Sequence, residues 1–226
     1  YRALLDLYLK KIRHVCVYFY AYNVRKINSH DDNNYKKRAD DICAIIFTSG
    51  TSGNSKAVQL TYSNFENSCQ NWDEFLQFNS KDQFLCCLPL SHIGGFAVLV
   101  RSLIYGFSIY LLDRFDAKSV HNVIYNYPIT IVSLVPTMLN RIIKIKDGTL
   151  VLKKLRYILL GGGPAPISLL DKCIIEKLPV IKVYGMTETC SGTFGLKLLN
   201  EPKNKIYAGR PFTNVKVWIK NKEIYI

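Results

Sequence analysis

Short apolar runs alternate with helix-length segments through the middle of this chain. Between residues 83 and 184, five runs of five or six mostly apolar residues are separated by segments with helical spacing. Apolar strands joined by helices of about ten residues indicate parallel strands, because a parallel pair needs a long crossover connection. The sequence therefore predicts an α/β fold with largely parallel sheets and helical crossovers. The predicted strands are Gln83–Leu88, Ser108–Leu112, Ile129–Leu134, Leu155–Leu160 and Val180–Tyr184, and the predicted helices are Phe96–Tyr105, Ala117–Tyr127, Pro136–Ile145 and Ser168–Lys177.

The two ends of the chain show other patterns. Tyr1–Lys11 has helical spacing, Val15–Tyr22 alternates as a strand does, and a polar connection runs on to Asp41. We therefore expect residues 1–40 to be a partial N-terminal segment and residues 41–226 to form the core. At the other end, Val215–Ile219 and Glu223–Ile226 flank a polar turn, which predicts an antiparallel hairpin.

The composition indicates a globular chain that binds small anions. Of 226 residues, 49% are hydrophobic, which is enough for a sizeable core. The net charge of +13 comes from 30 Lys and Arg against 17 Asp and Glu. A nucleic-acid partner would suit that charge, but the lysines are scattered and form no long basic run. We expect no nucleic-acid partner, and a positive field that attracts small anionic molecules.

Cysteine use and hydropathy bear on the compartment. The seven cysteines are odd in number, form no C-x-x-C pair and lie mostly in apolar surroundings. This indicates reduced thiols in a cytoplasmic setting, with neither a disulfide framework nor a zinc site. Ile93–Leu112 has roughly the length of a membrane span, but Arg101 at its centre would cost about 2.5–3.5 kcal/mol. We expect a buried helix, a turn at Gly106 and a strand, with no membrane insertion.

A Gly- and Ser-rich stretch, Thr48–Lys56 (TSGTSGNSK), follows an apolar run at Ile42–Phe47 that we expect to be a buried strand. Glycine lets backbone N–H groups approach a ligand, the hydroxyls add donors and Lys56 adds a positive charge, which together suit a polyphosphate. It is not a Walker A loop, since the two glycines are three apart and Ala57 follows the lysine. A Ser/Gly surface turn between a strand and the helix predicted at Thr61–Phe78 explains the stretch equally well.

Three more polar or glycine-rich turns follow predicted strands, and the carboxyl ends of strands are where α/β sheets bind ligands. Gly161–Gly163 offers bare backbone for a flat ring, and Tyr184 an aromatic face. Thr187 offers a hydroxyl donor, Glu188 could hold Mg²⁺, and His92 could contact a substrate carboxylate. Each also has a purely structural explanation. Gly161–Gly163 could be a tight turn, Glu188 a solvated surface carboxylate and His92 a core histidine.

These motifs resemble those of the adenylate-forming enzymes, which include acyl-CoA synthetases, luciferases and peptide-synthetase adenylation domains. Thr48–Lys56 is similar to the family's T-S-G-T-T-G-x-P-K-G loop, with Ser52, Ser55 and Ala57 as departures. Tyr184–Glu188 (YGMTE) looks like its adenine-stacking and Mg²⁺ motif, and Gly161–Pro166 (GGGPAP) like its adenine-pocket turn. Within the family, the chain looks most like the o-succinylbenzoate–CoA ligases of menaquinone biosynthesis.

The resemblance implies an ATP-dependent acid–CoA ligase that uses ATP, Mg²⁺ and CoA and adenylates an aromatic carboxylic acid. It implies catalytic roles for Lys56, Thr187, Glu188 and His92, with Glu188 positioning Mg²⁺. The residues implied to bind nucleotide are Thr48, Ser49, Gly50, Thr51, Ser52, Gly53, Lys56, Gly161, Gly162, Gly163, Tyr184, Gly185, Met186 and Thr187.

The end of the chain departs from the family pattern. Lys222 stands for the glycine of the family's G-E-I segment, and the later T-G-D aspartate, the hinge and the C-terminal domain with its catalytic lysine do not follow. We therefore expect an incomplete large domain that adenylates poorly. Two alternatives stay open: another acyl-CoA ligase or amino-acid adenylation domain, and a nucleotide-binding fragment without catalysis. A homo-oligomer also stays open.

Overall fold

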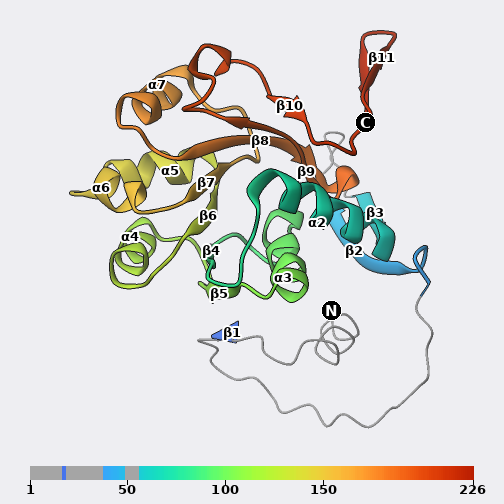
Figure 1. Cartoon of the computed structure of the whole chain (residues 1–226), viewed down its shortest axis with the longest axis horizontal. Coiled ribbons are helices and arrows are strands. Elements are labelled where there is room, and N and C mark those ends of the chain that lie inside the picture. The colour runs from blue at the N-terminus through green and yellow to red at the C-terminus, as the bar shows by residue number, and fades with distance from the viewer. Residues whose placement is uncertain (1–16, 19–37, 49–55) are drawn as a thin grey trace, which may run out of the picture.

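The computed structural model describes residues 17–18, 38–48 and 56–226, and its centre is a mostly parallel sheet (Figure 1). Among these residues, eight strands pair in the order β1-β5-β4-β6-β7-β8-β9-β10. Every pair from β1 to β8 is parallel, and β9 and β10 add two antiparallel strands at one edge. The strands are β1 Val17–Tyr18, β4 Gln83–Cys86, β5 Ser108–Leu111, β6 Ile131–Leu134, β7 Tyr157–Leu160, β8 Val180–Met186, β9 Ser191–Lys197 and β10 Arg210–Pro211.

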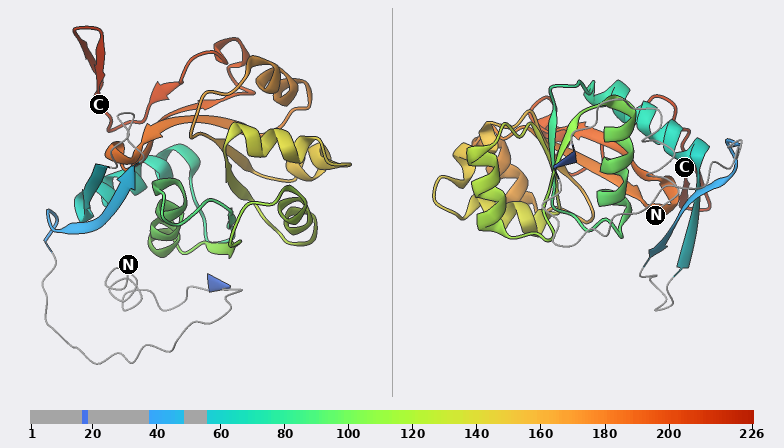
Figure 2. Two further views of the ribbon diagram at one scale, coloured as in Figure 1. Left: turned by 180° about the vertical axis from the view of Figure 1, so that it is seen from behind. Right: turned by 90° about the horizontal axis from the view of Figure 1, so that it is seen from below.

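Helices cover both faces of the sheet (Figure 2). α2 and α3 lie on one face, and α4 to α7 lie on the other. The predicted α/β fold with a largely parallel sheet is confirmed. The helices are α2 Tyr62–Leu76, α3 Ile93–Tyr105, α4 Ala117–Asn126, α5 Pro136–Ile143, α6 Gly148–Lys153 and α7 Ile167–Ile175, with short 3₁₀ turns η1 Thr187–Thr189 and η2 Pro202–Asn204.

The near-continuous apolar strands are explained by this two-sided cover. Successive side chains of a strand point to opposite faces of the sheet, so both faces need apolar residues when both are covered. In β4, Phe84 packs with the α2–α3 side and Leu85 with the α4–α7 side. In β7, Leu159 and Ile158 divide in the same way.

One strand prediction is wrong in its burial. Ile42–Phe47 was expected to be a buried strand, but β2 (Ile42–Thr48) forms a separate two-stranded antiparallel hairpin with β3 (Lys56–Thr61). Ile45 is 48% exposed and Phe47 63% exposed, and of the β2 residues only Ile46 is buried. An apolar run of this length predicts a strand, but it does not say which strand it pairs with or what covers its faces.

Several elements appear that the sequence did not predict, namely strands β3, β9 and β10, helix α6 and the 3₁₀ turns η1 and η2. β9 carries a weak strand signal, because two of its seven residues (SGTFGLK) are glycines. The C-terminal hairpin is confirmed, with β11 at Trp218–Lys220 and β12 at Glu223–Tyr225. The predicted helix at Tyr1–Lys11 lies outside the described residues.

The apolar stretch around Arg101 folds as expected. α3 ends at Gly106, whose φ of 72° lies in the left-handed region, and β5 follows. Arg101 is 2% exposed and points into the protein, where Nη2 donates to Ser191 Oγ at 2.9 Å. Within the described part of the chain, no helix is both long and apolar enough to cross a bilayer.

Buried thiols form part of the core. Cys69, Cys86, Cys87, Cys173 and Cys190 are all buried and carry free thiols. Burial raises the pKa of Cys69 to about 11 and that of Cys87 to about 12, because the thiolate loses its solvation. These thiols are therefore protonated at neutral pH and serve as small apolar side chains.

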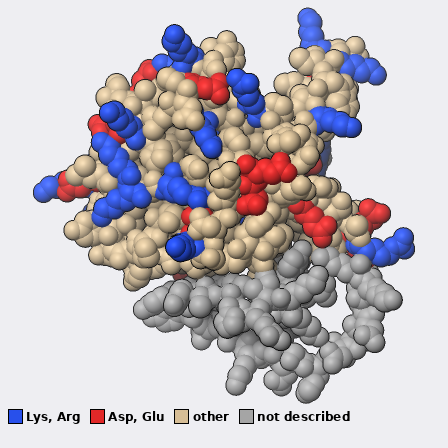
Figure 3. Space-filling model, in the orientation of Figure 1, with Lys and Arg blue, Asp and Glu red and all other residues tan. Residues whose placement is uncertain are grey.

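Charged side chains are dispersed over the surface. Figure 3 shows Lys and Arg side chains spread over the half of the molecule formed by α4 to α7 and over the β11–β12 hairpin, with acidic side chains between them. Part of this charge is paired, as in the ion pair of Lys153 with Glu176 at 3.1 Å.

A polar network ties the amino ends of three adjacent strands together. Asp82 is buried just before β4, and its carboxylate accepts from Thr130 Oγ1 at 2.8 Å and from Asn79 N at 3.0 Å. Arg156, just before β7, lies 3.2 Å from the same carboxylate and donates to the Leu76 carbonyl at the end of α2. One buried carboxylate therefore joins strands β4, β6 and β7 to helix α2.

We predict that Asp82→Asn lowers the free energy of unfolding by about 2–3 kcal/mol, because it removes a charged acceptor from a buried network. Urea unfolding followed by circular dichroism measures this loss. Glu176→Gln is the matched control, because its pair with Lys153 lies at the surface, with the two side chains 34% and 40% exposed, and should contribute less than about 1 kcal/mol. Equal losses in the two variants would contradict the prediction.

Candidate active site

The carboxyl end of β7 lies beside β8 and brings two predicted ring-binding features near each other. Leu160, the last residue of β7, is in register with Lys182, and β8 continues from there to Met186. A Cβ on Gly161 would come within 3.2 Å of the Val183 carbonyl oxygen, and Tyr184 is the next residue. Gly162 has φ +77°, a conformation that glycine adopts without strain. The glycine turn therefore lies directly beside the strand end that carries Tyr184.

Tyr184 presents an aromatic ring at this edge of the sheet. Its side chain is 39% exposed, and its ring packs edge-to-face on Phe194 with centroids 5.6 Å apart. This contact orients the ring, and part of the residue stays open to solvent. Tyr184 therefore offers an aromatic surface on which a flat heteroaromatic group could stack.

The chain after Tyr184 makes a tight turn from β8 into β9. A Cβ on Gly185 would lie 2.1 Å from the Ser191 carbonyl oxygen, so no larger residue fits without movement. Thr189 closes the turn, since its Oγ1 accepts from Met186 N at 3.0 Å and donates to the Ser191 carbonyl at 2.8 Å. Between these two ends, η1 presents Glu188 to solvent and leaves Thr187 half-buried.

Two helices hold this turn from inside the protein. Ser68 Oγ, on α2, donates to the Cys190 carbonyl at 2.7 Å, and Arg101, on α3, donates to Ser191 Oγ. No sequence motif predicted a role for Ser68 or Ser191. An arginine in the middle of an apolar stretch was the one available signal for Arg101, and only the fold shows which group it meets.

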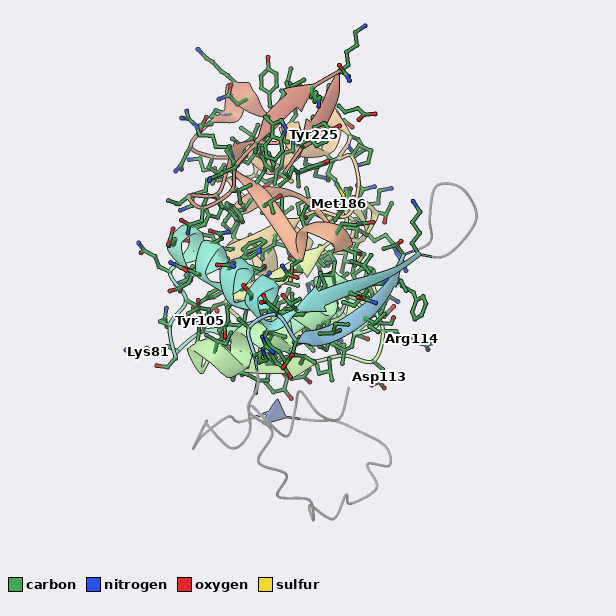
Figure 4. The ribbon with its side chains drawn as sticks, turned by 90° about the vertical axis from the view of Figure 1, so that its right-hand side faces the viewer. Lys81, Tyr105, Asp113, Arg114, Met186 and Tyr225 are labelled. Carbon is green, nitrogen blue, oxygen red and sulfur yellow. The ribbon has the colours of Figure 1, made fainter. Side chains whose placement is uncertain are left out.

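The predicted phosphate loop is only partly described. Thr48 pairs with Lys56 at the end of the β2–β3 hairpin where the chain passes from one strand to the other, and Lys56 is exposed. Ser49, Gly50, Thr51, Ser52 and Gly53 lie outside the described residues. β3 lies beside η1, so the strand that begins with Lys56 runs next to the turn that carries Glu188. Figure 4 shows Met186, which precedes η1, on the side of the molecule between this hairpin and the hairpin that carries Tyr225.

His92 belongs to the same edge of the sheet but not to the same cluster. It follows β4, which β6 and β7 separate from β8. His92 is the N-cap residue of α3, where its carbonyl accepts from Phe96 N at 2.9 Å and its exposed side chain makes no capping hydrogen bond. The imidazole is therefore available to a ligand that extends along the edge from Tyr184.

A cleft of about 360 Å³ opens beside Glu188, between α2 and the chain that follows β10. Asn71 and Thr193 lie in its wall, and the side-chain oxygens Asn71 Oδ1 and Thr193 Oγ1 are buried without a hydrogen-bond partner among the described residues. The cleft therefore offers polar groups next to the turn.

The donor set suits Mg²⁺ bound together with phosphate. Among the described residues, no group of three or more His, Cys, Asp or Glu side chains could hold a metal ion by itself. Mg²⁺ usually takes one or two carboxylates and fills its remaining positions with water and phosphate oxygens. The exposed carboxylate of Glu188 fits that requirement.

The family of the chain follows from a sequence comparison as well as from this geometry. The model of the family described as AMP-binding enzyme matches residues 9–224. The chain belongs to the AMP-binding enzymes. The resemblance of the three motifs to adenylate-forming enzymes is thereby confirmed.

Known relatives within the AMP-binding enzymes narrow the comparison. The chain is 39% identical over 184 residues to the 2-succinylbenzoate–CoA ligase of Oceanobacillus iheyensis, a match that covers 81% of this chain and 38% of that enzyme. The o-succinylbenzoate coenzyme A synthetase of Bacillus subtilis, solved in complex with ATP and magnesium ion, superposes with a TM-score of 0.77 at 32% identity. That match covers 88% of this chain and 42% of the synthetase chain. The chain therefore spans about two fifths of these relatives.

An inhibitor-bound N-terminal domain of FACL13 from Mycobacterium tuberculosis also has a TM-score of 0.77, at 25% identity. This match covers 86% of this chain and 50% of that domain. Agreement with an N-terminal domain and with the ligases above confirms the fold class. The role of each site residue in this AMP-binding enzyme remains a prediction.

We predict that Gly185→Ala destabilises the protein by about 2–3 kcal/mol or more, because the added Cβ meets the Ser191 backbone. Chemical denaturation measures the loss. Gly163→Ala is the matched control, since a Cβ on Gly163 meets nothing within 4 Å and its stability should change little. A stable Gly185→Ala protein would show that the turn is not closely packed.

Proposed function

We propose that this chain is the nucleotide-binding core of an ATP-dependent acid–CoA ligase whose acid is 2-succinylbenzoate, in menaquinone biosynthesis. The observation that supports the proposal is the contact of Gly161 with Val183, the residue before Tyr184, on the strand that leads into Thr187 and Glu188. A site for a flat base would then lie next to groups that suit phosphate and Mg²⁺. The named relatives support the choice of acid.

The proposed reaction has two steps. A carboxylate oxygen of the substrate attacks the α-phosphorus of ATP, so that an oxygen–phosphorus bond forms. The bond from the α-phosphorus to the pyrophosphate oxygen breaks, which gives the acyl adenylate and pyrophosphate. The sulfur of CoA then attacks the acyl carbon, the thioester forms and AMP leaves. Neither step needs a covalent bond to the protein, so the site acts by positioning the reactants and stabilising charge.

Adenine is assigned to the edge formed by β7 and β8. The base would lie between Tyr184 and the backbone of Gly161–Gly163, with Gly185 and Met186 continuing the wall. Tyr184 lies on β8 and Thr187 lies in η1, which follows β8 directly, so the two residues would hold the base and the α-phosphate at a set distance from each other. Thr187 would donate its hydroxyl to the α-phosphate.

The phosphate end of ATP is assigned to the β2–β3 hairpin. Thr48, Lys56 and residues 49–53 between them would hold the pyrophosphate leaving group, with Lys56 supplying positive charge. Glu188 would hold Mg²⁺, which when bound neutralises charge on the phosphate oxygens. His92 would face the acyl group, further along the same edge.

The remaining expectations belong to the same proposal. Residues 41–226 would form the AMP-binding core, preceded by a segment at residues 1–40. ATP, the aromatic acid and CoA would be the partners, with Mg²⁺ as the metal ion. A reducing, cytoplasmic compartment suits the buried free thiols of the core.

We predict that Tyr184→Ala weakens AMP binding by about tenfold, because base–aromatic stacking contributes about 1–3 kcal/mol. Isothermal titration calorimetry of AMP against the whole chain measures the change. Tyr207→Ala is the control, since the Tyr207 side chain is 60% exposed and lies outside the site. Absence of AMP binding by the unaltered chain would overturn the nucleotide assignment.

The identity of the acid is tested separately by ATP–pyrophosphate exchange. We expect exchange to be fastest with 2-succinylbenzoate when it is compared with benzoate, a medium-chain fatty acid and an amino acid. A faster exchange with a fatty or amino acid would replace the proposed substrate by that class. Adding CoA and following thioester formation then tests the second step.

A further inference from the structure

Arg101 is a buried cation without a carboxylate beside it. The residue is 2% exposed, and no described Asp or Glu forms an ion pair with it. Its guanidinium carbon lies 4.5 Å from the centroid of the Trp72 ring, and its Nη2 donates to Ser191 Oγ at 2.9 Å. Arginine is seldom fully buried unless it is paired, so this placement needs an explanation.

The partner of Arg101 lies at the end of the β8–β9 turn. Ser191 has φ 94° and Cys190 has φ 52°, so two consecutive residues with side chains occupy the left-handed region. Such a backbone persists only where neighbouring groups hold it, and strained backbone of this kind gathers at functional sites. The groups that contact this backbone and the Ser191 side chain are Ser68 from α2, Thr189 within the turn and Arg101 from α3.

Arg101 differs from the other two groups, because it donates to a side chain and is itself held by packing. The face of its planar guanidinium packs on Trp72, and an edge meets Ser191. A guanidinium can stack and donate at the same time, which an ammonium group does less well. The position of Ser191 therefore depends on the packing of α2 against α3.

We propose that Arg101 is a positioning residue for the Thr187–Glu188 turn, which it orients through Ser191 for binding the phosphates and Mg²⁺ of ATP. This inference rests on the proposed function. Glu188 is exposed, and its direction depends on the backbone of the turn. Arg101 acts on the phosphate half of the site, whereas the adenine slot depends on the register of β7 with β8.

Because the phosphate half and the adenine half of the site depend on different contacts, comparing Mg·ATP with adenosine separates a positioning role of Arg101 from a general effect on the structure. Loss of the Arg101–Ser191 hydrogen bond should weaken binding of Mg·ATP and leave binding of adenosine unchanged. We expect Arg101→Met and Ser191→Ala each to weaken Mg·ATP binding about tenfold, and adenosine binding less than twofold. Calorimetry of the whole chain with each ligand gives both constants.

The double variant tests whether the two residues act as one unit. Arg101→Met with Ser191→Ala should lose no more Mg·ATP affinity than either single variant, because both remove the same hydrogen bond. Arg101→Lys should recover part of the loss, since an ammonium group can still donate to a hydroxyl. Arg141→Met is the control, because Arg141 is exposed on α5 and contacts Phe115 away from the site.

The outcomes separate the inference from the proposed function. If the unaltered chain binds neither adenosine nor Mg·ATP, the proposed function fails and the inference fails with it. If the unaltered chain binds both and Ser191→Ala binds Mg·ATP equally well, the inference alone is overturned. A parallel loss of adenosine and Mg·ATP affinity would also overturn it, by showing a general structural role. If Arg101→Met does not fold, Ser191→Ala still tests the inference, because it removes the same hydrogen bond without changing a charge.

Discussion

Parallel pairing of β7 with β8 is the interaction on which the rest of this site depends. The register that sets Leu160 beside Lys182 also sets Gly161 beside Val183, so the glycine turn and Tyr184 emerge together. An antiparallel pair would send these two segments to opposite edges of the sheet. At the opposite end of the strands, the Asp82 network joins the amino ends of β4, β6 and β7. The strand-anchoring network and the proposed ligand site therefore lie at opposite ends of the strands of one sheet, an arrangement usual in α/β proteins.

The turn after β8 combines close packing with strain. Gly185 is there because the β9 backbone approaches too closely for any side chain. Cys190 and Ser191 then take left-handed backbone conformations, although neither is a glycine. Hydrogen bonds from two helices compensate for that strain. The result is a short segment that holds Thr187 and Glu188 without a long loop, which limits their freedom before any ligand arrives.

The β2–β3 hairpin is where tertiary structure departs most from the sequence pattern. Its first strand is as apolar as a central strand, yet Ile45 and Phe47 are largely exposed and β2 pairs only with β3. Strand formation was predictable, because it depends on local composition. Pairing was not, because it depends on segments far away and on what covers each face. The hairpin still reaches the site, since β3 lies beside η1.

The sequence by itself determined the fold class, most of the helix and strand positions of the main sheet, and the order of the turns proposed to bind ligands. These follow from periodicity and from turn residues, which act over a few neighbours. Only the tertiary structure showed that Gly161 and Tyr184 are adjacent while His92 stands apart, because strand order is set by packing and not by order in the chain. The contact of Arg101 with Ser191 was also decided there. A single charge in an apolar stretch reveals that it needs a partner, but the partner, Ser191, is ninety residues away and meets it only when α3 packs against β9.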